Sequence, residues 1–147
     1  ALSGMPGEGS VRDVGKVSKQ EEIKARKDGL AVWDDILRYA ELGFSAITDE
    51  DFYLMRWYGI YQQIPKAGHF MMRIKIPGGI YTSEQLRTIA AITDERGRGI
   101  ADVTTRQTFQ WHWLTVEDFP EIVARLKAVG ISPVGACGDI ARNVVAC

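Results

Sequence analysis

The stretch FMMRIKIPGG, residues 70–79, predicts a strand that ends in a tight turn. Its side chains alternate between two faces, as they do in a strand that buries one face and leaves the other open. One face carries Met72, Ile74 and Ile76, and the other carries Met71, Arg73 and Lys75. Proline followed by two glycines then ends the strand, because proline cannot donate a hydrogen bond to a sheet and glycine is common in turns.

The residues after this turn predict two helices and three further strands. Capping boxes, which mark helix starts, are formed by two pairs: Thr82 with Gln85, and Thr115 with Asp118. The helices are expected over residues 83–95 and 116–129, where apolar side chains recur at helical spacing. Strands are expected over residues 100–104 and 108–114 and within residues 139–147. The strand at 108–114 is expected to bury three aromatic side chains on one face: Phe109, Trp111 and Trp113.

This order of elements, β-α-β-β-α-β from about residue 69 to residue 147, predicts an α+β protein with a ferredoxin-like fold. In that plan the first and third strands are neighbours in the centre of the sheet, and the fourth lies beside the first. Both helices cover one face, which leaves the other open. We place this ferredoxin-like half-domain at residues 67–147 and expect it to be incomplete at its C-terminus, where the sequence reads as a strand without a following turn.

The sequence before the half-domain predicts a helical extension over residues 20–66. A helical pattern covers residues 21–38 with an interruption at Gly29, and a short helix is expected over residues 49–58. Residues 1–19 are rich in glycine and carry few large apolar side chains, so we expect a flexible arm there.

The composition is that of a soluble globular protein, with 46% hydrophobic and 25% charged residues. A net charge of −1 argues against a general nucleic-acid binder, and no apolar run approaches the roughly 20 residues that cross a membrane. The two cysteines, Cys137 and Cys147, have the spacing of neither a dithiol motif nor a zinc site. We therefore expect reduced thiols in a cytoplasmic protein.

The open face of the predicted sheet gathers cations and hydrogen-bond donors. They come from the two central strands, the loop before the third strand, and the fourth strand: Arg73, Lys75, Gln110, His112, Arg106 and Arg142. Such a patch suits a polyanion, because guanidinium groups form charge-assisted hydrogen bonds with oxyanions. Polar side chains are also ordinary on the exposed face of an antiparallel sheet, so a face without a function is the alternative.

Three segments of the sequence resemble motifs of the sirohaem-dependent nitrite and sulfite reductases. They are HFMMRIKIPGG at residues 69–79, DVTTRQTFQWHW at residues 102–113 with the pattern T-x-R-Q-x-x-Q-x-H, and GACGDIARNVV at residues 135–145 with G-D-x-x-R-N-V. The upstream WYGIYQQ, residues 57–63, is also similar. The resemblance covers roughly residues 20–147 and identifies the chain as the amino-terminal part of such an enzyme.

Members of this family reduce nitrite to ammonia, or sulfite to sulfide, with six electrons at sirohaem coupled to a [4Fe–4S] cluster. The resemblance implies that Arg73 and Arg142 are catalytic residues that hold the substrate anion. It also implies a set of residues that bind the sirohaem: Lys75, Thr104, Arg106, Gln110, His112 and Asn143. The implied partners are nitrite or sulfite, the C-terminal half of the same enzyme, and an electron donor, which is ferredoxin in many members and a flavoprotein in others.

The four cysteines that hold the cluster in this family have no counterparts here. We therefore expect that this chain alone binds no metal, retains no cofactor and is inactive. Asp102 stands where some sulfite reductases have arginine, which favours the nitrite branch, but nitrite and sulfite both remain candidate substrates.

Two other classes of protein share the predicted fold. RNA-recognition modules bind single strands through aromatic side chains on the open face, but the aromatic set here fits the inward face, and the net charge is slightly negative. A regulatory ferredoxin-like domain without catalysis is the second alternative. We expect neither a nucleic acid nor a membrane among the partners.

Overall fold

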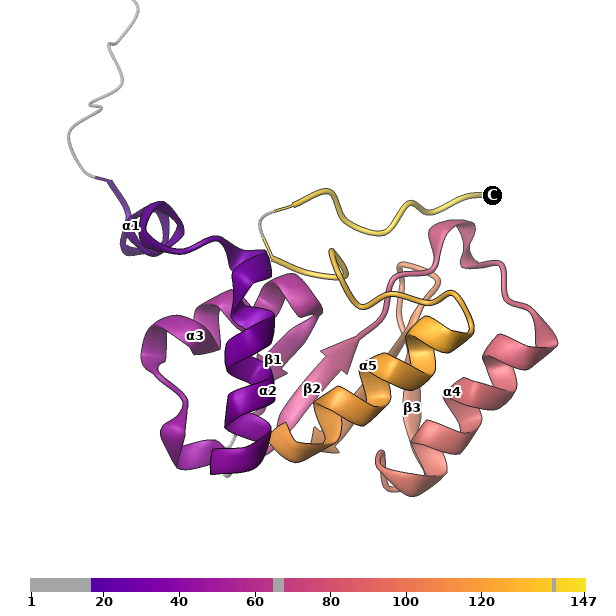
Figure 1. Cartoon of the computed structure of the whole chain (residues 1–147). Helices are drawn as coiled ribbons and strands as arrows, with labels where there is room; N and C mark the ends of the chain where they lie inside the picture. The colour runs from indigo at the N-terminus through magenta and orange to yellow at the C-terminus, as the bar shows by residue number, and fades with distance from the viewer. Residues whose placement is uncertain (1–16, 65–67, 139) are drawn as a thin grey trace, which may run out of the picture.

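The computed structural model describes residues 17–64, 68–138 and 140–147, whose arrangement is shown in Figure 1. The helices are α1 (Lys19–Arg26), α2 (Val32–Leu42), α3 (Asp49–Leu54), α4 (Ser83–Glu95) and α5 (Phe119–Ala128). The strands are β1 (Ile60–Gln62), β2 (Phe70–Arg73), β3 (Ala101–Val103) and β4 (Phe109–Leu114). No helix in this part of the chain is long and apolar enough to span a membrane.

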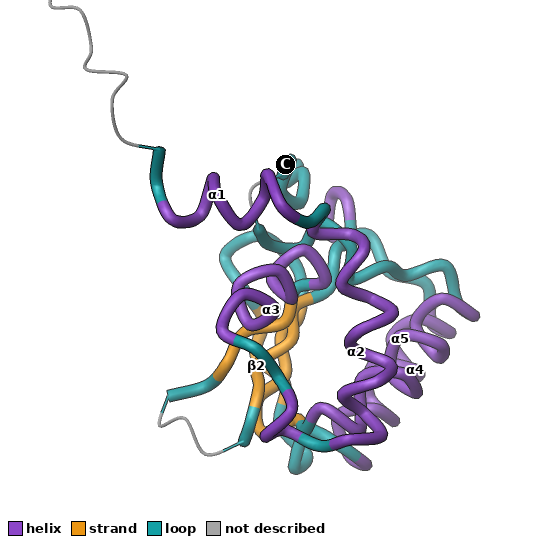
Figure 2. Tube along the Cα trace, turned by 60° about the vertical axis from the view of Figure 1, so that its left-hand side comes forward, coloured by secondary structure: helices purple, strands orange, loops and turns teal. Residues whose placement is uncertain are grey.

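Within the described residues, the strands form one antiparallel sheet in the order β1-β2-β4-β3. The first and third strands of the predicted plan, β2 and β4, are therefore the central neighbours, and Arg73 lies opposite Gln110. Figure 2 shows α2, α4 and α5 together on one side of the sheet. The α+β, ferredoxin-like prediction is confirmed.

Burial along β2 and the residues after it confirms the predicted register. Met72 and Ile74 are fully buried and Ile76 nearly so, whereas Arg73 and Lys75 are only partly buried. The three apolar side chains belong to a core that includes residues of α4 and α5. Since neighbouring side chains of a strand point to opposite faces, Arg73 projects away from these helices.

The predicted fourth strand is wrong. Residues 140–147 form no strand, and Asp139 lies outside the described residues. The place beside β2 belongs to β1, where Ile60 pairs with Met72 and is fully buried. Burial explains the difference, because Ile60 adds a core side chain to this edge, whereas Val144 and Val145 are at least half exposed.

The helices upstream of the sheet share its core. The helical pattern breaks near Gly29, as predicted, and α3 continues into a 3-10 turn at Met55–Tyr58. Ile36, Tyr39 and Leu54 are buried in the same cluster as the side chains of β2. The residues predicted as an extension therefore stabilise the sheet and contribute β1 to it. Most of the predicted arm, residues 1–16, lies outside the described residues.

Both predicted capping boxes are present. The Thr82 hydroxyl accepts from the Gln85 backbone N–H at 3.1 Å, and the Gln85 side chain accepts from the Thr82 N–H at 2.9 Å. Asp118 likewise accepts from the Thr115 N–H at 2.8 Å. These reciprocal bonds satisfy backbone donors that a helix start otherwise leaves unpaired. They explain why α4 begins at Ser83, as the local sequence predicts.

A β-bulge in β4 makes the prediction for Trp113 wrong. Phe70 pairs with Leu114 and Met72 with Trp111, so β4 has one more residue than β2 between these pairs. Trp111 and Leu114 are fully buried, but Trp113 is 39% exposed and has a φ of 67°. Its ring lies against the guanidinium of Arg98, which is 4.4 Å from the ring centroid. Because of the extra residue, Leu114 and not Trp113 faces the core after Trp111, in contrast to the strict alternation that the sequence suggests.

A partly buried ion-pair network joins the end of α1 to α2 and α3. The Asp51 carboxylate accepts hydrogen bonds from Lys27 Nζ at 2.7 Å and from the Tyr39 hydroxyl, and Lys27 also pairs with Asp35. Burial alone would raise the pKa of Asp51. The hydrogen bonds from Lys27 and Tyr39 outweigh burial and hold the pKa of this carboxyl below its ordinary value.

We expect the free energy of unfolding to decrease as the pH falls through the pKa of Asp51, and Asp51→Asn to remove about 1–3 kcal/mol at neutral pH. Because this pKa is lower in the folded than in the unfolded chain, the stabilisation is complete above the unfolded value and is lost as the carboxylate is protonated. Urea unfolding at a series of pH values measures both effects. Asp49→Asn, an exposed position of the same helix, is the control, and an equal loss in both variants would contradict the prediction.

Candidate anion-binding site

A pocket of about 440 Å³ opens on the face of the sheet that Arg73 and Gln110 share. It is lined by β2, β4, the end of β3 and the turn after it, and the segment that follows α5, which we call the C-terminal segment: Arg73, Val103, Thr104, Thr105, Arg106, Thr108, Gln110, Ala136, Arg142 and Asn143. All of the predicted site residues except Lys75 and His112 line it. Their guanidinium, amide and hydroxyl groups make the lining cationic and rich in hydrogen-bond donors.

Arg73 is held in the pocket by contacts on several sides. Its Nε donates to Gln110 Oε1 at 2.9 Å, as expected for register partners on adjacent strands. The guanidinium carbon lies 5.7 Å from the centroid of the Tyr61 ring, which belongs to β1. Nη1 lies 3.5 Å from the sulfur of Cys137. Arg73 is therefore oriented before any ligand binds, which reduces the entropic cost of binding.

Arg142 reaches the same sulfur from the C-terminal segment. Its Nη2 lies 3.8 Å from Cys137 Sγ, so the two guanidinium groups are neighbours. Burial, and then a hydrogen bond with the Cys137 thiol, raise the pKa of the Tyr61 phenol. Neither arginine forms an ion pair with a carboxylate among the described residues. Two neighbouring positive charges without a counterion favour the binding of an anion.

Asn143 joins the C-terminal segment to the residues after β2 and to the turn between β3 and β4. Its Nδ2 donates to the carbonyl of Ile76 at 2.8 Å and to that of Arg106 at 2.9 Å. The residue is 4% exposed, and its buried Oδ1 has no hydrogen-bond partner among the described groups. A buried acceptor of this kind is usually satisfied by a bound group or a water molecule.

Lys75 and His112 do not line the pocket, but both bind residues in its lining or next to it. Lys75 Nζ donates to the carbonyl of Ala141 at 3.1 Å, beneath the segment that carries Arg142. His112 Nε2 lies 3.1 Å from Asp102 Oδ2 and 3.3 Å from Gln110 Nε2. The structure thus connects His112 to Arg73 through Gln110 but does not bring the two side chains together.

Three residues near the site were missed as site residues from the sequence. Asp102 lies opposite Gln110 in the β3–β4 register, Tyr61 lies on β1, and Cys137 lies between the two arginines. Tyr61 and Cys137 belong to segments 57–63 and 135–145, so the family motifs contained them without marking a role. The structure joins neither Cys137, which is buried, nor Cys147, which is exposed, in a disulfide.

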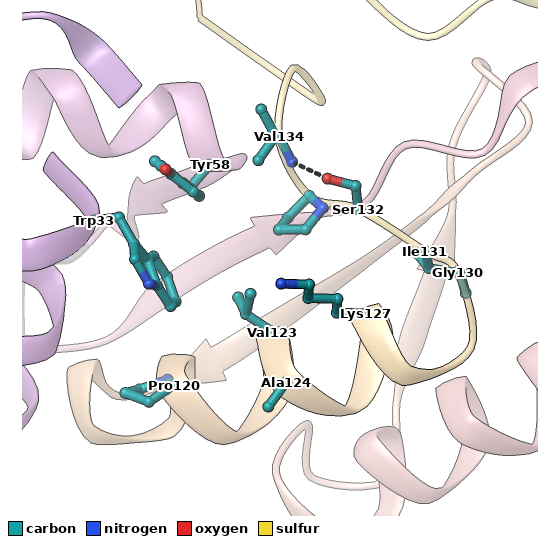
Figure 3. Close-up of a pocket in the computed structure, with 11 residues that line it drawn as sticks. Trp33, Tyr58, Pro120, Val123, Ala124, Lys127, Gly130, Ile131, Ser132 and Val134 are labelled. Carbon is teal, nitrogen blue, oxygen red and sulfur yellow. Dashed lines mark hydrogen bonds between the residues drawn. The ribbon is translucent and has the colours of Figure 1, made fainter. Parts of the chain in front are cut away.

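A larger cavity, of about 590 Å³, lies between α5, the end of the helical segment around Tyr58, and residues 130–134 (Figure 3). Its walls include apolar side chains of α5 and the stacked rings of Trp33 and Tyr58, whose centroids are 5.1 Å apart. Lys127 is the one cationic side chain among its lining residues. This apolar cavity is therefore less suited to a small anion than the pocket around Arg73 and Arg142.

Residues 61–129 match the family model of the nitrite/sulfite reductase ferredoxin-like half domain. The chain contains the ferredoxin-like half domain of the nitrite/sulfite reductase family. The resemblance found in the sequence is thereby confirmed. The matched region begins on β1 and ends after α5, so it includes the sheet except for Ile60 and both helices of the predicted half-domain, although it omits residues 130–147.

Relatives in this family include both nitrite and sulfite reductases. The chain is 40% identical to the ferredoxin–nitrite reductase of Synechococcus elongatus, over 88% of this chain and 26% of that protein. It is 37% identical to a ferredoxin-dependent sulfite reductase of Mycobacterium tuberculosis, again over 88% and 26%. The solved structure of the Mycobacterium tuberculosis NirA protein superposes with a TM-score of 0.81 at 35% identity, over 86% of this chain and 26% of that one. The chain thus spans about a quarter of the length of these relatives.

Proposed function

We propose that the chain is part of an assimilatory-type reductase that converts nitrite to ammonia, or sulfite to sulfide, at sirohaem coupled to a [4Fe–4S] cluster. The observation that carries this proposal is the meeting of Arg73 and Arg142 at one pocket, because two neighbouring guanidinium groups match a small oxyanion. The relatives are ferredoxin-dependent nitrite and sulfite reductases, which supports ferredoxin as the electron donor. We place the enzyme in the cytoplasm, where free thiols such as Cys137 persist.

The pocket fits a cofactor that is rich in carboxylates. Arg106 lines the pocket, is exposed and forms no ion pair with the described residues, so its guanidinium is available to a carboxylate. Sirohaem, when bound, supplies the redox chemistry. We assign its binding to six residues that the resemblance singles out: Lys75, Thr104, Arg106, Gln110, His112 and Asn143.

Arg73 and Arg142 act on the substrate anion in this proposal. Their guanidinium groups hold its negative charge and donate hydrogen bonds to its oxygens as the N–O or S–O bonds weaken. Gln110 fixes the orientation of Arg73 through the 2.9 Å hydrogen bond. The cysteines of the cluster belong to other segments of the enzyme, so we expect no reductase activity from this chain alone.

We expect Arg106→Ala to weaken sirohaem retention in the complete enzyme by about 10- to 100-fold, because one charge-assisted contact with a carboxylate is lost. The absorbance of sirohaem per protein after gel filtration measures this. Arg87→Ala removes an exposed arginine from α4, on the helical side of the molecule, and should retain the wild-type sirohaem content. Full retention in Arg106→Ala would show that this arginine does not bind the cofactor.

A further inference from the structure

The side chain of Gln107 holds the backbone of the C-terminal segment. Its Nε2 donates to the carbonyl of Ala146 at 2.7 Å, and its Oε1 accepts from the Ala146 N–H at 2.9 Å. One amide side chain thus makes the pair of hydrogen bonds that a neighbouring strand would make. We call these two bonds the Gln107 clasp.

Gln107 occupies a backbone conformation that few residues other than glycine adopt. Its φ is 61°, in a turn closed by the bond from the Gln107 N–H to the Thr104 carbonyl at 3.0 Å. Its own carbonyl accepts from the Tyr81 hydroxyl at 2.9 Å. A Cβ atom on Gly79 would lie 2.7 Å from Gln107 Cβ, so the turn after β2 packs directly against it. Strain held by so many contacts is often found near functional sites.

The clasp is one of few contacts that fix the residues carrying Arg142 and Asn143. The segment forms no strand, and Val144 and Val145 are 64% and 50% exposed, so apolar burial contributes little to its position. The other contacts are the Gly78 N–H, which donates to the Val144 carbonyl at 2.8 Å, the Lys75 bond to the Ala141 carbonyl, and the Asn143 and Arg142 contacts described above.

We propose that Gln107 is a positioning residue for the anion site: its clasp holds the C-terminal segment so that Arg142 reaches the pocket beside Arg73. The effect on turnover rests on the proposed function, because it requires that Arg142 contact the substrate. The existence of the clasp does not rest on the proposed function, because the clasp consists of hydrogen bonds within the chain.

The test is Gln107→Gly in the complete enzyme. Glycine adopts a φ of this sign readily, so the turn is kept while both bonds of the clasp are removed. The matched control is Arg98→Gly, which makes the same kind of change at another residue with positive φ, 57°, whose side chain contacts Trp113 and does not line the pocket. A second variant, Gln107→Glu, keeps the acceptor for the Ala146 N–H but places a carboxylate oxygen against the Ala146 carbonyl.

Two measurements decide the proposal. Hydrogen exchange in peptides covering residues 140–147 should be at least about 10-fold faster in Gln107→Gly and Gln107→Glu than in Arg98→Gly or the wild type. The KM for nitrite or sulfite should increase about 10-fold in both Gln107 variants, while the sirohaem content and the melting temperature match those of Arg98→Gly. A purely structural role would not raise KM selectively.

Each of the other possible results overturns either the clasp, the positioning role of Gln107 or the assignment of Arg142. Unchanged exchange in Gln107→Gly would show that the clasp does not hold the segment. Faster exchange with an unchanged KM, in an enzyme where Arg142→Ala impairs turnover, would overturn the positioning role and leave the proposed function intact. If Arg142→Ala has wild-type kinetics, both the assignment of Arg142 and the positioning role fail, whereas the exchange result still reports on the clasp.

Discussion

Arg73→Ala is expected to lower the turnover of the complete enzyme with nitrite or sulfite by about 30- to 1000-fold. In the proposed function, the substitution removes a positioned, charge-assisted donor from the transition state, which costs about 2–4 kcal/mol. Arg142→Ala should act in the same way, since both guanidinium groups meet at the pocket. Steady-state kinetics, corrected for the sirohaem content of each preparation, measures the loss.

The sirohaem content separates this role from cofactor binding. Arg73→Ala should retain much more of its sirohaem than of its activity, whereas Arg106→Ala should lose sirohaem first. Arg73→Lys keeps the charge but loses the planar fork of donors, so its activity should lie between those of the wild type and Arg73→Ala. Wild-type turnover in Arg73→Ala would refute the assignment of Arg73 to the substrate.

Trp111→Ala is expected to reduce the free energy of unfolding by about 3–5 kcal/mol, the range for the loss of a large buried aromatic side chain. The indole is fully buried, and its Nε1 donates to the Thr93 hydroxyl at 2.8 Å. Trp113→Ala on the same strand should cost less than about 1 kcal/mol, because that ring is partly exposed and contributes its ring contacts with Arg98 and His69.

Chemical denaturation of the two variants provides the comparison. If Trp111→Ala does not fold, Trp111→Phe fills most of the same space and loses only the N–H donor, so about 1–2 kcal/mol of destabilisation is expected. Equal losses at positions 111 and 113 would contradict the bulge, since a regular strand would bury both rings on one face.

The predictable parts of the fold depend on neighbours in the sequence. The two capping boxes need only residues three apart, and they correctly place the starts of α4 and of the segment that leads into α5. The alternation at residues 70–76 likewise gives the buried and open faces around Arg73. Because the plan makes β2 and β4 neighbours, the sequence also predicted that Arg73 and Gln110 share a face.

The parts that failed depend on pairing between distant residues. The bulge at Trp113 is defined by the pairing of β4 with β2, and no pattern within the sequence of β4 indicates the extra residue. Whether β1 or residues 140–147 lie beside β2 depends on the burial of Ile60 relative to that of Val144, two residues that are far apart in the sequence. Local propensity cannot make that comparison.

The sequence alone determined the family, the α+β plan and the cationic character of the open face. Motifs, helix caps and the alternation of apolar and polar side chains each depend only on short stretches of neighbouring residues. The tertiary structure alone decided that Cys137 and Tyr61 lie beside Arg73, that Asp102 pairs with His112, and that Gln107 bonds to Ala146. These contacts join residues that are far apart in the chain, except for Asp102 and His112, whose pairing follows from the β3–β4 register. Their geometry is set by the packing of the whole core, so it can be known only once every element is in place.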